Sequence, residues 1–190
     1  MIQKKKKGEF QYLDRLKSNY LWKILLYLVI GLAIFMIGLL LNKMEPRNIF
    51  SVIAILMVLP GAKQVVGLIA TFPYHSVTKK EYEHILSYLK EGQNLYVDML
   101  MTSKDRIMLF PYMVEVPGKI IALADPKEKD VKGVEKDLFQ NVRNYCSDYQ
   151  VCVFKEEKYF LRELSRMIPQ EVKEEEREQV LKILFTLVMP

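Results

Sequence analysis

The stretch that decides the fold is residues 20–41, which read YLWKILLYLVIGLAIFMIGLLL. From Ile24 to Leu41 it contains neither a charged residue nor a proline. A helix needs about 20 mainly apolar residues to cross a hydrocarbon core of about 30 Å, because each residue adds about 1.5 Å. The uncharged run exceeds the about 7–15 apolar residues of a signal peptide, and no small-residue cleavage site follows it. The stretch therefore predicts a retained membrane-spanning helix.

A second apolar stretch, residues 49–72, follows a polar turn of seven residues, 42–48. So short a turn forces the two predicted helices to pack antiparallel, as a hairpin. Small residues let membrane helices approach each other closely. The candidates for helix packing are Gly31, Gly38, Pro60, Gly61 and Gly67.

Polar residues interrupt the second helix near its middle. Pro60 removes a backbone hydrogen bond, so we expect a kink there. Lys63 and Gln64 follow directly, and a charge inside a membrane normally faces protein or water. Two interpretations stay open. Either both residues lie inside a helix assembly, where they could line a pore, or the span ends at Ala62 and Lys63 reaches the inner interface.

The charge distribution indicates the orientation. Residues 1–48 hold nine Lys/Arg and three Asp/Glu, whereas residues 73–190 hold 18 Lys/Arg and 20 Asp/Glu. Because Lys and Arg favour the cytoplasmic side, both termini should be cytoplasmic and the turn outside. Lys4, Lys5, Lys6 and Lys7 are candidates for binding lipid headgroups. The predicted domains are a basic leader (1–18), the transmembrane hairpin (19–72) and a cytosolic domain (73–190).

The cytosolic part should be a small α+β domain with a mixed sheet, in the order α-β-β-β-α-β-α-α. Thr78 and Glu81 form a capping box at the start of its first helix. Pro111 lies inside the second strand, so this strand should be bulged or at an edge there. The run 150–154 is apolar throughout, which favours an interior strand. The last helix, 171–188, has an apolar second half that exceeds the obvious need of one small core.

No phosphate-binding loop, zinc spacing or catalytic triad occurs, and we expect no cofactor. The two cysteines, Cys146 and Cys152, fit core positions. The order α-β-β-β-α-β resembles the core of the restriction-endonuclease-like family. That resemblance implies a Mg²⁺-dependent site at Asp105, Asp125 and Lys127, although Pro126 interrupts the tripeptide. Because the domain is net acidic, the sequence argues against DNA binding.

The leader, the two apolar runs and the residues Leu-Pro-Gly-Ala-Lys at 59–63 also resemble uncharacterised two-helix membrane proteins of Gram-positive bacteria. We expect a membrane-anchored, non-enzymatic interaction or scaffold protein that self-associates or binds a protein partner in the lipid bilayer. The alternatives are a membrane-tethered nuclease-like enzyme and a small oligomeric channel. No nucleic acid is expected as a partner.

Overall fold

The computed structural model describes residues 7–103, 106–144, 149–170 and 172–189. They belong to two compact units. The hairpin unit is Asp14–His75, and the globular unit combines Met1–Leu13 with Ser76–Pro190. The predicted order of elements is confirmed, from the two apolar arms through α-β-β-β-α-β-α-α.

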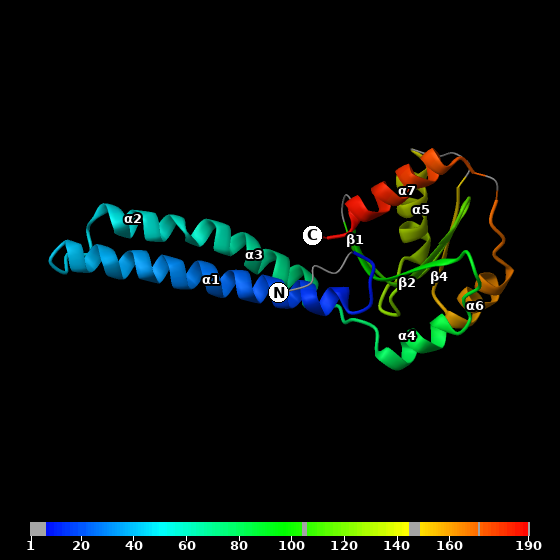
Figure 1. Ribbon diagram of the computed structural model, residues 1–190, viewed down its shortest axis with the longest axis horizontal. Coiled ribbons are helices and arrows are strands. Elements are labelled where there is room, and N and C mark those ends of the chain that lie inside the picture. Colours follow the sequence, from blue (N-terminus) through cyan, green and yellow to red (C-terminus); the bar gives the residue numbers. More distant parts are fainter. Residues whose placement is uncertain (1–6, 104–105, 145–148, 171, 190) are drawn as a thin grey trace. The chain divides into compact units, whose positions relative to one another are not determined.

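The hairpin consists of α1 (Tyr12–Leu41), which runs antiparallel to α2 (Ile49–Leu56) and α3 (Val58–Thr71) (Figure 1). Both apolar segments, Tyr12–Leu41 and Ile49–Thr71, are long and apolar enough to cross a membrane. Almost none of the residues in their most apolar windows are buried, unlike those of a core helix. The hairpin therefore presents apolar side chains outward along its length.

The start of the first helix and the position of the kink in the second arm differ from those predicted from the sequence. α1 begins at Tyr12, inside the predicted leader, because no proline or glycine interrupts residues 12–19. The expected kink at Pro60 occurs three residues earlier, as a break between α2 and α3 at Met57. Pro60 cannot donate to the carbonyl of Leu56, and its ring crowds that carbonyl, so the preceding turn yields.

The globular unit contains a four-stranded mixed sheet in the order β1-β2-β3-β4. Pairing is antiparallel between β1 and β2 and between β2 and β3, and parallel between β3 and β4. The strands are β1 (Asn94–Thr102), β2 (Ile107–Val116), β3 (Lys119–Leu123) and β4 (Gln150–Phe154).

The expectation that residues 150–154 form an interior strand was wrong, whereas the expectation of a local edge at Pro111 agrees with the structure. β4 is an edge strand, and it is apolar because helices cover both faces of the sheet. Pro111 lies in β2 just beyond the residues that pair with β3, so β2 is locally an edge there, and its register with β1 does not shift. It is tolerated because β3 ends before reaching it and because Asp98 opposite it leaves the extended conformation, with φ of 55°. The Asp98 carboxylate accepts a hydrogen bond from the Val77 amide at 3.1 Å.

Helices cover both faces of the sheet, which gives three layers (Figure 1). α4 (Lys79–Leu86) and α6 (Glu157–Arg166) lie on one face, and α5 (Val131–Arg143) and α7 (Glu174–Leu187) lie on the other. The core on the α4–α6 side includes Ile85, Tyr112, Val114, Phe160 and Leu164.

The apolar half of α7 is used by the core, contrary to the expectation of surplus apolar surface. Val180, Leu184 and Val188 are buried, and the Phe185 ring packs edge-on against Tyr96. Among the described residues of α7, none is a large exposed apolar side chain. Cys152 is half-buried on β4, where burial raises the pKa of its thiol; Cys146 lies outside the described residues.

Candidate functional sites

Two glycines bring the arms of the hairpin into close contact. A Cβ atom at Gly38 would lie 2.4 Å from the Cβ of Phe50, and one at Gly67 would lie 2.7 Å from the Tyr20 ring. At Gly38 the neighbour is a Cβ atom fixed close to the backbone, so only glycine fits there without moving the arms. At Gly67 the neighbour is the end of the Tyr20 side chain, which would have to move. One contact lies beside the turn and the other near the base of the hairpin.

Between these contacts the arms leave an apolar groove of about 620 Å³. Gly31 and Gly61 line it, and a Cβ at either position would make only ordinary contacts at 3.7 Å. The other lining residues are apolar or aromatic and come from both arms; they include Tyr27, Leu28, Ala54, Val58, Ala62 and Val65. Small side chains thus open the middle of the hairpin rather than closing it.

The glycine contacts define the register of the two arms. Position 20 lies opposite 67, 27 opposite 61, 31 opposite 57 and 38 opposite 50. The residue numbers of two opposite positions therefore add up to about 88, so the position on α1 that lies opposite Lys63 is about 25. Lys23 lies only two residues away, about 3 Å along the axis. From Lys23 to Asn42 in the turn, α1 rises about 28 Å.

The two polar residues of α3 have different environments. Gln64 is half-buried, whereas Lys63 is exposed. Lys63 makes no hydrogen bond or ion pair with any residue that the structure describes, and neither residue lines the groove. Lys63 therefore stands at one end of the uncharged span, level with Lys23, rather than at its centre.

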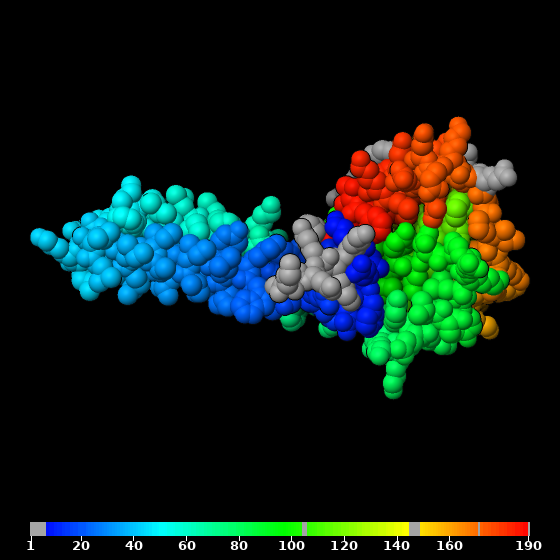
Figure 2. Space-filling view, in the orientation of Figure 1, coloured from blue at the N-terminus to red at the C-terminus, as the bar shows by residue number. Residues whose placement is uncertain are grey.

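Residues 7–13 of the leader belong to the globular unit. The Lys7 ammonium donates to the carbonyls of Phe185 and Val188, at 2.8 and 2.6 Å. These carbonyls end α7, where a positive charge is favoured by the helix dipole. Figure 2 shows the start of the described chain, in deep blue, beside the red end of α7. Lys4, Lys5 and Lys6 lie outside the described residues.

Both ends of the chain cover the free edge of β1. The Val97 amide donates to the Gly8 carbonyl at 2.8 Å, and the Met189 amide donates to the Leu100 carbonyl at 2.9 Å. The Tyr12 hydroxyl donates to the Met189 carbonyl at 2.9 Å, which ties the two ends together. An uncovered edge strand invites pairing with another chain, and this cover removes part of that risk.

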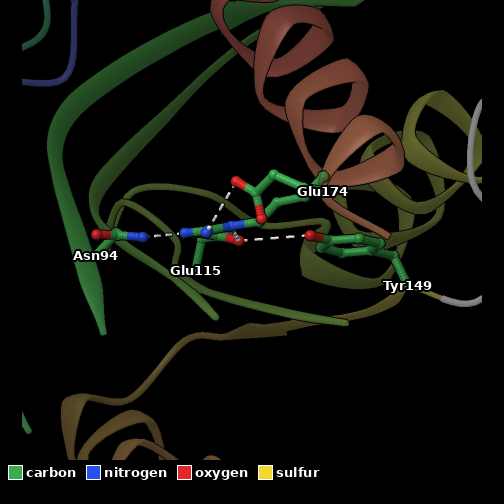
Figure 3. Close-up of polar contacts among 5 residues, drawn as sticks. Asn94, Glu115, Tyr149 and Glu174 are labelled. Atoms are coloured by element: carbon green, nitrogen blue, oxygen red, sulfur yellow. Dashed lines mark hydrogen bonds and ion pairs between the residues drawn. The ribbon is translucent and has the colours of Figure 1, made fainter. Parts of the chain in front are cut away.

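A buried charge cluster, missed by sequence reasoning, lies between β2 and α7. Glu115 has no exposed surface, and Arg177 donates to both of its oxygens, at 2.9 and 3.2 Å. Asn94 donates at 2.9 Å and the Tyr149 hydroxyl at 3.4 Å. Figure 3 shows these contacts, with Glu174 beside the cluster. A charged residue within the apolar run 107–116 was the signal in the sequence.

The electrostatics of this cluster indicate a structural role. The hydrogen bond to Glu115 raises the pKa of Arg177, so the guanidinium stays charged. Burial, and after it the charge of Glu115, raises the pKa of Tyr149 to about 12. Because both carboxylate oxygens already accept hydrogen bonds, the cluster fixes α7 to the sheet and leaves no oxygen aimed at a substrate.

Of the three nuclease candidates, the structure describes Asp125 and Lys127, which lie in one surface turn. Asp125 follows β3, and its carboxylate accepts a hydrogen bond from the Lys127 amide at 2.7 Å, which closes a surface turn. The Lys127 side chain is exposed, and Asp105 lies outside the described residues. Within the described parts of the chain, no group of three or more His, Cys, Asp or Glu residues is arranged to hold a metal ion.

Comparison with known proteins adds no assignment to these sites. No protein-family model, no curated protein and no solved structure matches the chain.

Proposed function

We propose that the protein is a membrane-anchored, non-enzymatic interaction protein whose hairpin crosses the bilayer and whose globular unit is cytosolic. The observation that carries the proposal is the apolar, outward-facing surface of both arms. The rise of about 28 Å between Lys23 and the turn fits a hydrocarbon core of about 30 Å. The excess of Lys and Arg in residues 1–48 supports a cytoplasmic location for both termini.

The groove supports self-association of the hairpin. Membrane helices associate where small residues let them approach, and a two-helix hairpin has no third helix to fill its groove. We propose a second copy as the occupant, because two hairpins can bury both grooves in one symmetric four-helix bundle. The position of Lys63 at the end of the span favours this anchor over a channel with a charged lumen.

Filling the groove tests self-association. Ala54→Phe and Ala62→Phe place aromatic rings in the groove, whereas Ala33→Phe puts the same ring on an exposed position of α1 outside it. We expect light scattering in mild detergent to give a dimer for the wild type and for Ala33→Phe, and a monomer for both groove variants. A monomeric wild type at all concentrations would contradict the proposal, and retained lipid in that monomer would assign the groove to an acyl chain.

A further inference from the structure

The register of the hairpin points to a site for a lipid phosphate, and this inference rests on the proposed insertion into a bilayer. We propose that Lys23 and Lys63 together bind the phosphate of an anionic phospholipid at the inner end of the hairpin. Sequence position alone left Lys63 near the middle of its helix. The glycine contacts place it opposite position 25, within about 3 Å of the level of Lys23.

Both lysines belong to the same face of the hairpin. Successive residues of a helix turn by about 100°. On α1, the line of contact with the other arm runs through Tyr20, Tyr27 and Gly31. The groove-lining residues Ile24 and Leu28 lie on one side of that line. The same rotation places Lys23 on the other side.

On α3, Lys63 likewise lies on the side of the helix away from the groove. Gly61 and Gly67 lie about 120° apart around α3 and border the face that contacts α1, and the groove-lining residues Val58 and Val65 lie on the Gly61 side of this face. Lys63 falls on the other side. Because the helices are antiparallel, this is the side of the hairpin that carries Lys23. Two flexible side chains of the same charge thus extend from one face at one depth.

Three further observations favour a phospholipid phosphate over another anion. Both lysines are exposed, and Lys63 has no acidic partner among the described residues. Trp22, which is next to Lys23, is 66% exposed. Tryptophan prefers the headgroup region of a membrane, so its position marks this level independently. Two ammonium groups at that depth complement the negative charge of headgroup phosphates, which are the anions present there.

The single tryptophan of the chain provides the test. The full-length protein is reconstituted in phosphatidylcholine, and quenching of Trp22 is compared for dibrominated phosphatidylglycerol and dibrominated phosphatidylcholine. We expect the anionic lipid to be preferred by up to about 30-fold at low salt, since each of the two lysines contributes about fivefold. The Lys23→Gln/Lys63→Gln variant should lose this preference. The matched control, Lys43→Gln/Arg47→Gln, removes two charges at the turn and should keep it.

The outcomes separate this inference from the proposed function. Equal quenching by both lipids in the wild type, or an unchanged preference in the double variant, would overturn the lipid site while leaving insertion intact. No quenching by either lipid would show that the hairpin is not inserted, which would overturn both. Loss of the preference on adding inorganic phosphate at constant ionic strength would assign the lysines to a free anion and overturn the lipid assignment.

Discussion

Glu115 is a carboxylate without access to water, and its charge is balanced by Arg177 on α7. Asn94 on β1 and Tyr149, the residue before β4, donate further hydrogen bonds to it. Removing one member of a buried ion pair leaves the other uncompensated, which costs about 3–5 kcal/mol of folding free energy. The two partners are not equivalent. The Arg177 side chain is 21% exposed and also forms an ion pair with Glu174. Without Glu115, Arg177 would still have water and a second carboxylate as partners, whereas Glu115 without Arg177 would have neither.

We therefore expect Arg177→Leu to destabilise the globular unit by about 3–5 kcal/mol and Glu115→Leu to destabilise it less. The double variant should recover most of the loss, because two apolar side chains of similar size can replace a buried pair. Urea unfolding of the full chain in mild detergent, followed by circular dichroism, measures all three. Simple additivity in the double variant would show that the pair is not energetically coupled. Equal losses in the single variants would contradict the predicted difference between Arg177 and Glu115.

Tyr149 should give the globular unit an alkaline limit of stability. Its pKa is raised to about 12 in the folded protein, whereas an unfolded tyrosine has a pKa of about 10. The folded state therefore holds the proton more tightly, so this stabilisation is complete below pH 10 and is lost as the pH rises towards 12.

The Tyr149→Phe variant should lose part of this decline in unfolding free energy between about pH 10 and 12. Tyr159→Phe is the control, because Tyr159 is exposed and should leave the pH profile unchanged. Part of the alkaline decline in unfolding free energy should remain in Tyr149→Phe, because burial also raises the pKa of Tyr112, which destabilises the folded state when it loses its proton. A Tyr149→Phe profile identical to that of the wild type would show that its hydroxyl does not titrate with folding.

At the scale of elements, the glycines of the hairpin fall into two groups that sequence spacing cannot separate. Gly38 and Gly31 lie seven residues apart on one face of α1, yet only Gly38 is in close contact with the other arm. Gly38→Ala should push the arms apart at the turn, because the added methyl group overpacks the contact and costs about 1–3 kcal/mol of stability. Gly31→Ala should be tolerated, because its Cβ meets atoms no closer than 3.7 Å.

Proximity of the arms measures this difference. A pair of cysteines is introduced in one chain, at Leu40 and Ile49, after Cys146 and Cys152 have been replaced. This pair should form a cross-link as readily in the Gly31→Ala variant as in the chain that keeps Gly31. The same pair should cross-link less with Gly38→Ala. Equal cross-linking in both variants would mean that the contact between Gly38 and Phe50 does not hold the turn together.

The existence of most elements could be predicted from local pattern, whereas their partners could not. The capping box at Thr78 and Glu81 forms as the sequence indicates. Lys7, in contrast, binds carbonyls at the end of α7 that lie 178 and 181 residues along the chain, and no periodicity encodes such a contact. The edge position of β4 was missed because burial by two helix layers gives the same apolar run as an interior strand.

For the whole protein, the proposed function requires the turn of the hairpin to lie outside the cell and the globular unit to lie in the cytosol. The excess of Lys and Arg before α1 and the polar turn of seven residues predict cytoplasmic termini and an outer turn. Position 8 is unsuitable for a reporter, because Gly8 has φ of 82° and is enclosed by Tyr96 and Met99. Glu9, Glu45 and Glu91 are exposed and suit single cysteine substitutions.

The most direct test is labelling of these three single-cysteine variants in intact cells with a membrane-impermeant maleimide, after replacing Cys146 and Cys152 by alanine. We expect Glu45→Cys to be labelled in intact cells, and Glu9→Cys and Glu91→Cys to be labelled only after permeabilisation. Labelling of Glu91→Cys in intact cells, or of all three variants alike, would contradict a hairpin anchor with a cytosolic globular unit.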